Sequence, residues 1–185
     1  SSFINEKADA NLVVATGNTP MGAYQRLASM SRSGLLDLSR ARFFQLDAYL
    51  GERADSDGPN LYAWILRDLI EPAGIPLCNV HRLSADASDP AKAGRDLDRL
   101  IGEVGGVDLA ILGLGLNGHV GFNEPGTSSS AGTRVVDLSH ETLASNAEYW
   151  GQEHEVPRQG ITVGLGTLVE SRQILLLVSG AHKSA

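Results

Sequence analysis

The strongest constraint on the fold is the regular alternation of short apolar runs with amphipathic segments along the chain. The runs LVVA at 12–15, RFFQL at 42–46 and VDLAIL at 107–112 have the length and composition of buried strands. Between them, the segments at 20–30 and 90–104 repeat apolar residues at helical spacing. Strands that alternate with helices predict an α/β fold, in which a mainly parallel sheet carries helices on both faces.

The rest of the chain continues the same pattern. We expect further helices at 60–70 and near 140–149, and further strands at 80–83, 133–138, 161–165 and 174–178. Asp89 is the predicted cap of the helix at 90–104. No internal repeat or linker interrupts the pattern, so residues 1–185 are expected to form a single domain. The last apolar run is followed by almost no sequence that could cover it, so we expect the natural protein to be longer at both ends.

Composition narrows the class of partner. The net charge is −7 and no Lys/Arg cluster stands out, which argues against nucleic acid or an anionic membrane as a partner. A small anionic substrate is compatible with this charge, because a few local cations and helix ends can hold it. The only cysteine, Cys78, is expected to be a packing residue, and its isolation favours the reducing cytoplasm. The apolar runs are far shorter than the ~20 residues of a membrane helix.

The loop ATGNTPMG at 15–22 leaves a predicted strand and enters a predicted helix. Thr16, Gly17, Asn18 and Thr19 would place hydroxyl and backbone N–H groups at the start of that helix. This arrangement suits a phosphate group, although the GxxxxGK[ST] pattern of a P-loop is absent. An ordinary helix cap explains the same residues equally well.

A second loop, LDAYLG at 46–51, puts Asp47 where a predicted strand ends. In open parallel sheets, ligands lie beyond the carboxyl ends of the strands. A carboxylate at that position is well placed to transfer a proton. Asp47 could also be a simple turn or cap residue.

The third loop, LGLGLNGHVGFNEPG at 112–126, contains the G-x-G-x-x-G spacing of a dinucleotide site. Such a site requires Gly118 to lie inside the first turn of a helix, and the Gly, Pro, Asn and Ser residues that follow disfavour a helix there. We favour chemistry instead, in which His119 moves a proton and Glu124 stabilises its charged form. Asn117 could hydrogen-bond the same group. The histidines show no metal-ligand spacing, so no metal is predicted.

Four stretches of the chain resemble the glucosamine-6-phosphate deaminase (isomerase) family. GLGLNGHVGFNEPG resembles its signature loop, ATGNTPMGAY its phosphate loop, and FFQLDAYLG the segment of its catalytic aspartate. ITVGLGTLVESRQILLLVSGAHK resembles its late strand–loop–strand region. Their order and spacing match along nearly the whole chain. The related 6-phosphogluconolactonases share the GxxGH part but normally lack the Asn-Glu-Pro that follows.

The resemblance implies a modified Rossmann-like fold and the conversion of an amino-sugar 6-phosphate into a ketose 6-phosphate and ammonia, without a redox cofactor. Asp47 would be the base that carries a proton between C2 and C1. His119 would assist ring opening, with Glu124 as its orienting and charge-balancing partner. Residues 16–19 and Lys183 would bind the phosphate. Family members occur as monomers and as hexamers, so a homo-oligomer is open.

The chain departs from the family pattern at several positions. Asn117 stands where some members have an aspartate that helps to hold the histidine, and Ala48 replaces a common glutamate. Glu148 occupies the place of a phosphate-binding arginine, so either it points away or another cation, such as Arg134 or Arg158, serves instead. The loss of that arginine leans toward galactosamine 6-phosphate over glucosamine 6-phosphate as substrate.

Other functions stay open. A 6-phosphogluconolactonase-type hydrolase would cleave a lactone without Asp47. A non-enzymatic sugar-phosphate sensor would bind its ligand without turnover. A dinucleotide enzyme would bind NAD.

Overall fold

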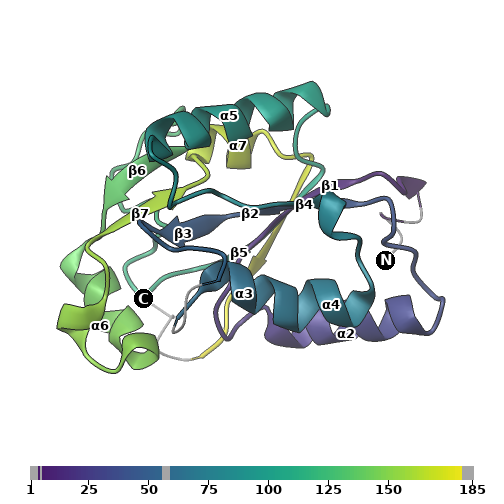
Figure 1. Ribbon diagram of the computed structural model, residues 1–185, viewed down its shortest axis with the longest axis horizontal. Helices are drawn as coiled ribbons and strands as arrows, with labels where there is room; N and C mark the ends of the chain where they lie inside the picture. Colours follow the sequence, from purple (N-terminus) through teal and green to yellow (C-terminus); the bar gives the residue numbers. More distant parts are fainter. Residues whose placement is uncertain (1–3, 5, 56–58, 181–185) are drawn as a thin grey trace.

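The computed structural model describes residue 4, residues 6–55 and residues 59–180. A five-stranded parallel sheet runs through its centre in the order β4-β2-β1-β5-β8 (Figure 1). The strands are β4 (Val80–His81), β2 (Arg42–Gln45), β1 (Asn11–Val14), β5 (Leu109–Gly113) and β8 (Gln173–Leu177). The predicted α/β class with a mainly parallel sheet is therefore confirmed, and the strands lie within a few residues of their predicted positions.

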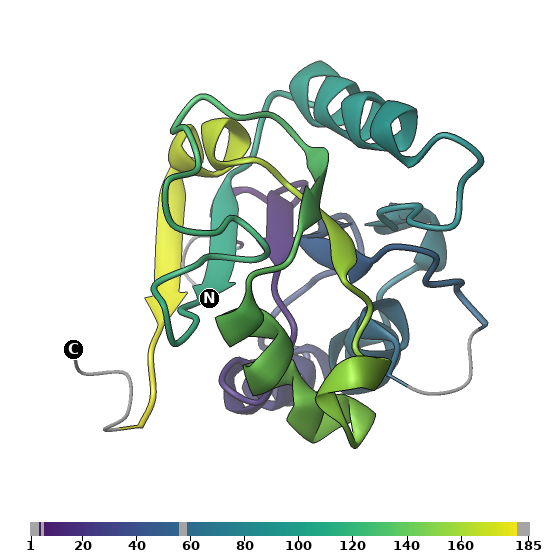
Figure 2. The same cartoon turned by 90° about the vertical axis from the view of Figure 1, so that its left-hand side faces the viewer.

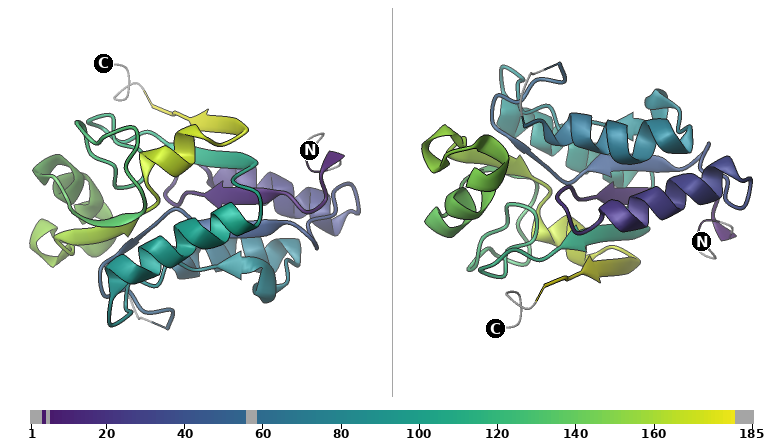
Figure 3. Two further views of the ribbon diagram at one scale, coloured as in Figure 1. Left: turned by 90° about the horizontal axis from the view of Figure 1, so that it is seen from above. Right: turned by 90° about the horizontal axis from the view of Figure 1, so that it is seen from below.

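Helices cover both faces of this sheet, as predicted (Figures 1 and 3). One face carries α2 (Met21–Arg32), α3 (Leu61–Ile65) and α4 (Glu71–Ala73), and the other carries α5 (Pro90–Glu103) and α7 (Leu165–Val169). The reason lies in the alternation of side chains along a strand. In β1, Leu12 and Val14 belong to the core cluster beneath α2, whereas Val13 belongs to the cluster beneath α5.

A second, antiparallel sheet of three strands was not predicted. It runs in the order β3-β7-β6, with β3 (Asp47–Tyr49), β7 (Gln159–Thr162) and β6 (Arg134–Asp137). The predicted strand at 161–165 is wrong in its bounds, because Leu165 already begins α7. Gly164 explains the break: a Cβ there would lie 2.0 Å from the carbonyl oxygen of Ala131, so only glycine lets the two segments approach.

Local signals fix several helix boundaries. Asp89 accepts a 2.8 Å hydrogen bond from the Lys92 amide, which confirms it as the cap of α5. Asn60 caps α3 in the same way, and the predicted helix at 60–70 continues as a π-helical turn, η1 (Leu66–Ile70). The prediction for Cys78 is wrong: it is exposed, because it lies in the short 3-10 turn η2 (Leu77–Asn79) before the edge strand β4.

The remaining helix, α6 (His140–Trp150), and the turn η3 (Glu153–Glu155) stand at one end of the molecule. Figure 2, viewed toward this end, shows α6 in the foreground, before the carboxyl ends of the parallel strands. A third apolar cluster, which includes Tyr49, Phe122 and Leu138, joins α6 to the small sheet. In the described part of the chain, no helix has both the length and the apolar character needed to cross a membrane.

Candidate active site

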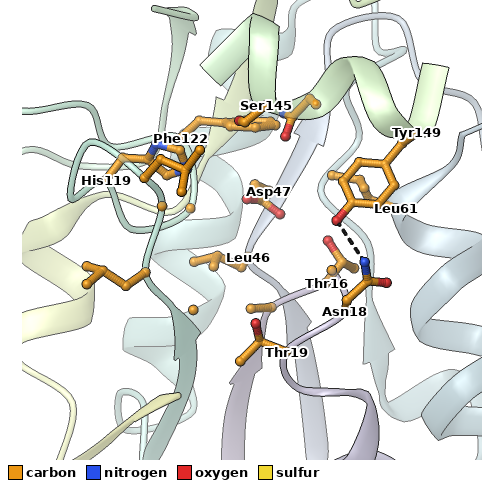
Figure 4. A pocket seen from close by; sticks show the side chains of 18 of the residues that line it. Thr16, Asn18, Thr19, Leu46, Asp47, Leu61, His119, Phe122, Ser145 and Tyr149 are labelled. Atoms are coloured by element: carbon orange, nitrogen blue, oxygen red, sulfur yellow. Dashed lines mark hydrogen bonds between the residues drawn. The ribbon is translucent and has the colours of Figure 1, made fainter. Parts of the chain in front are cut away.

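A cavity of about 620 Å³ lies between the carboxyl ends of the central strands and α6 (Figure 4). The three loops selected from the sequence all reach it: residues 16–19 follow β1, Asp47 follows β2, and His119 follows β5. α6 supplies a further wall with Ser145, Asn146, Glu148 and Tyr149. Lys183, predicted to bind phosphate, lies outside the described residues. The fold thus brings together side chains that are about 100 residues apart in the sequence.

The His119 ring is held through Nδ1. This nitrogen lies 2.7 Å from Asn117 Oδ1 and 3.1 Å from Thr142 Oγ1. The Asn117 amide is itself oriented, because its Nδ2 donates a 2.8 Å hydrogen bond to Glu124 Oε2. Asn117 Oδ1 can only accept, so Nδ1 donates to it and carries the hydrogen of the neutral ring. Nε2 is then the basic nitrogen of neutral His119, whose side chain lines the cavity.

Glu124 reaches His119 chiefly through intermediaries. Its Oε2 lies 3.8 Å from His119 Nδ1, which is an ion-pair distance rather than a hydrogen bond. Its oxygens accept from the Thr142 hydroxyl at 2.6 Å and from the Ser139 amide at 3.0 Å. Partial burial opposes ionisation, but these bonds, the Asn117 amide and the nearby His119 hold the pKa of Glu124 below its usual value. Glu124 therefore places a stable negative charge behind the imidazole.

Glycine makes room for this histidine. A Cβ at Gly115 would lie 2.3 Å from His119 ring atoms, so any other residue would displace the ring. Gly118 has a φ of +88°, in the left-handed region that glycine tolerates. The chain contains no helix between β5 and β6. The glycine spacing therefore serves the histidine loop, and the expectation that no helix forms at Gly118 is confirmed.

Asp47 occupies a different environment. It is the first residue of β3 and is 8% exposed. Within the described residues, its Oδ1 has no hydrogen-bond partner. Burial, together with the nearby Glu52 carboxylate, raises the pKa of Asp47 to about 7. In Figure 4 the side chain lies between His119 and Tyr149, so a group that can gain or lose a proton near neutrality lies within the cavity.

The loop at 16–19 contacts other walls of the cavity. The N-cap of α2 is Pro20 and no side chain caps it, so the helix-cap explanation of the threonines is wrong. Thr19 Oγ1 lies 3.4 Å from Ser179 Oγ, and Asn18 Nδ2 donates to Tyr149 Oη at 3.4 Å. The loop is therefore joined to the end of β8 and to α6 across the cavity.

Sequence reasoning missed Thr142 and Ser139. Ser139 is the N-cap of α6 and accepts from the Thr142 amide at 3.2 Å. A serine in this position is a common helix start. Nothing in the local sequence indicates that the hydroxyl groups of Ser139 and Thr142 also contact Asn117 and Glu124 behind His119. Neither substitute cation lines the cavity: Arg134 donates to Asn123 Oδ1 at 2.9 Å, and Arg158 lines a separate hollow beside α6.

Comparison with known proteins agrees with this architecture. The sequence model of the glucosamine-6-phosphate isomerases/6-phosphogluconolactonase family matches residues 1–185. A glucosamine-6-phosphate deaminase of a Geobacillus species is 40% identical over 182 residues, 98% of this chain and 72% of that protein. One from Streptomyces coelicolor is 40% identical over 186 residues, 100% of this chain and 70% of that protein.

Solved structures extend the comparison to the fold. The structure of a monomeric glucosamine-6-phosphate deaminase superposes with a TM-score of 0.92 at 34% identity, over 98% of this chain and 75% of that one. A 6-phosphogluconolactonase from Thermotoga maritima is more distant, with a TM-score of 0.73 at 26% identity, over 99% of this chain and 76% of that one. This chain belongs to the family of glucosamine-6-phosphate isomerases and 6-phosphogluconolactonases.

Proposed function

We propose that residues 1–185 form an amino-sugar-6-phosphate isomerase domain that releases ammonia and yields a ketose 6-phosphate. One observation carries the proposal: a buried carboxyl group with a pKa of about 7 and a histidine of fixed tautomer line the same cavity. The deaminase names of relatives at 40% identity support the substrate class. The single cysteine and the acidic net charge support a cytoplasmic enzyme of small molecules.

Ring opening is the first task. A closed amino sugar opens when a proton reaches the ring oxygen, the bond from that oxygen to C1 breaks, and the C1 hydroxyl releases its proton to water, which leaves an aldehyde at C1. His119 can deliver this proton from Nε2 when its ring is charged. Asn117 and Thr142 hold Nδ1, and the Glu124 carboxylate lies 3.8 Å from that nitrogen, so the charged ring is stabilised while Nε2 reacts.

Isomerisation is the second task. Asp47 as a carboxylate removes the proton from C2 while the C1 carbonyl oxygen takes up a proton from water, which gives an enolamine. The protonated acid then delivers its proton to C1 while the amino nitrogen releases one to water, so the carboxyl group ends as it began. The resulting C2 imine takes up water and loses ammonia, which leaves a ketone. A pKa near neutrality suits this role, because the same group must both take and give the proton.

Substrate positioning is assigned to the loop at 16–19. Its hydroxyl, amide and backbone groups lie at the cavity edge beside the start of α2, and a phosphate held there would provide binding energy remote from the reacting carbons. We include Lys183 in this site on the strength of the family resemblance.

The direct test is ammonia release from glucosamine 6-phosphate and galactosamine 6-phosphate, measured in parallel. Release from either supports the proposal, and the ratio of kcat/KM identifies the preferred epimer. Binding of both sugars without release would favour a sensor. Hydrolysis of 6-phosphogluconolactone, unaffected by Asp47→Asn, would favour a lactonase.

A further inference from the structure

The described residues that line the cavity contribute negative charge, which is unusual for a site that should take a phosphate ester. Asp47 and Glu148 both line it. Among the described residues that line it, none is a lysine or an arginine. Asp47 has a place in the proposed chemistry, whereas Glu148 has none. This leaves a second carboxylate at the cavity to be explained.

Glu148 lies close to the loop at 16–19. Burial, together with the neighbouring Glu148 carboxylate, raises the pKa of Tyr149. The Tyr149 hydroxyl oxygen accepts from Asn18 Nδ2 at 3.4 Å, a contact drawn in Figure 4. Trp64 packs against the Tyr149 ring edge-on, with ring centroids 5.2 Å apart. Glu148 is thus the sequence neighbour of a tyrosine that contacts the loop proposed to hold the phosphate.

The phosphate of a bound substrate and the Glu148 carboxylate are both negatively charged, so they repel each other in this part of the cavity. A sugar phosphate carries close to two negative charges at pH 8, and Glu148 adds a third a short distance away. The Glu148 side chain is exposed, so water and salt reduce the repulsion without removing it.

We propose that Glu148 is a specificity-determining residue, whose negative charge weakens binding of the 6-phosphate and so narrows the preference for phosphorylated over unphosphorylated amino sugars. This inference rests on the proposed function. It differs from a purely structural role, in which Glu148 would serve only to hold Tyr149 and the loop at 16–19.

The test is Glu148→Gln, because glutamine keeps an oxygen that can accept from Tyr149 but removes the charge. We expect KM for glucosamine 6-phosphate to fall about three- to tenfold at low ionic strength, with a much smaller change in kcat. The difference from the wild type should shrink in 0.5 M NaCl (about a 4 Å screening length). KM for unphosphorylated glucosamine should not fall. Glu141→Gln, at an exposed position of the same helix, is the matched control.

An unchanged or higher KM for the phosphorylated sugar in Glu148→Gln would overturn the proposal, as would an equal fall in KM for both sugars. Failure of the proposed function would look different, because the wild type would then release no ammonia from any amino-sugar phosphate. In that case, the role of Glu148 is tested by calorimetric binding of glucose 6-phosphate and of glucose to the wild type and to Glu148→Gln. Tighter binding of glucose 6-phosphate alone by the variant would sustain its role, and equal binding would refute it.

Discussion

His119 and Asp47 line the same cavity but are held in opposite ways. The imidazole is fixed by a network of side chains from two segments, the loop after β5 and the start of α6. The Asp47 carboxyl group is fixed by its place in β3, which pairs with β7, and its Oδ1 lacks a hydrogen-bond partner among the described residues. One group is surrounded by polar contacts, and the other is largely removed from water.

This difference suits the two proposed tasks. A group that delivers a proton in one direction works best with fixed geometry and a stabilised charge, which the network behind His119 provides. A group that takes and returns the same proton needs a pKa near the working pH, which burial gives Asp47. Each prediction below alters one side of the comparison and leaves the other in place.

The largest effect is expected from Asp47→Asn. The amide has nearly the same shape but cannot take a proton, so kcat should fall by about 10²–10⁴ while sugar-phosphate binding is largely retained. Steady-state kinetics and calorimetric binding check this. Asp137→Asn, at an exposed position of the same small sheet, should have little effect. Equal loss of binding and activity would make Asp47 structural.

The same variant should be more stable than the wild type at alkaline pH. The native pKa of Asp47 lies above its ordinary value, so the native state binds the proton more tightly than the unfolded state. The free energy of unfolding therefore decreases as the pH rises from about 4 to about 7. Removal of the charge should recover about 2–4 kcal/mol at pH 8 and almost nothing at pH 4. Thermal unfolding at both pH values measures this.

His119→Gln tests the other side of the comparison. Without the imidazole, the closed sugar should react about 10²-fold more slowly, whereas an open-chain analogue should lose much less. Parallel assays with both substrates separate ring opening from proton transfer between carbons. Equal losses with both would remove ring opening as the role of His119.

Thr142→Val tests the support behind the histidine. The change removes a hydroxyl that contacts His119 Nδ1 and donates to Glu124, so the ring should lose part of its orientation. We expect kcat/KM for the closed sugar to fall about tenfold, a typical cost of losing such an outer contact. Thr142→Ser keeps the hydroxyl and should restore most of the activity. A serine variant as impaired as the valine variant would show that the methyl group matters instead.

The two sides also differ in how far the sequence predicted them. Asn117, His119 and Glu124 lie within eight residues, so their local spacing suggested a common role. The alternation of apolar runs likewise predicted a mainly parallel sheet, because side-chain periodicity is a local property. Thr142 escaped notice because its contact with His119 depends on how α6 packs across the loop.

The environment of Asp47 could not be predicted either. The sequence placed it at a strand end, but its burial arises from pairing with Thr162, more than 100 residues away. Strands were predicted near β6 and β7, but β3 has only three residues and was missed, and so was the pairing of these strands into a separate antiparallel sheet. Glu52 gave no signal, although its side chain is 7% exposed and accepts from the Tyr62 amide at 3.1 Å.

Glu52→Gln gives the smallest expected effect and addresses the electrostatics of Asp47. Glu52 and Asp47 both carry buried carboxyl groups, and Gln45 donates a 2.9 Å hydrogen bond to the backbone carbonyl oxygen of Asp47. Tyr24 from α2 and Tyr49 from β3 are the other titratable groups nearby, and both have pKa values raised chiefly by burial, so they are neutral at pH 7. Glu52 is therefore the charged group that raises the pKa of Asp47.

Since Asp47 acts as a base when ionised, kcat/KM should fall as the pH drops through about 7. Removal of the Glu52 charge makes ionisation easier, so this acid limb should move to lower pH, by about half to one unit. It should not reach the ordinary aspartate value, because burial is the larger cause and remains. Glu71→Gln, an exposed position on α4, controls for net charge. The acid limb would belong to the imidazole if it stayed in place in Glu52→Gln but shifted when His119 is replaced. The pKa near 7 that governs kcat/KM would then be a property of the network around His119 rather than of the buried Asp47 carboxyl group.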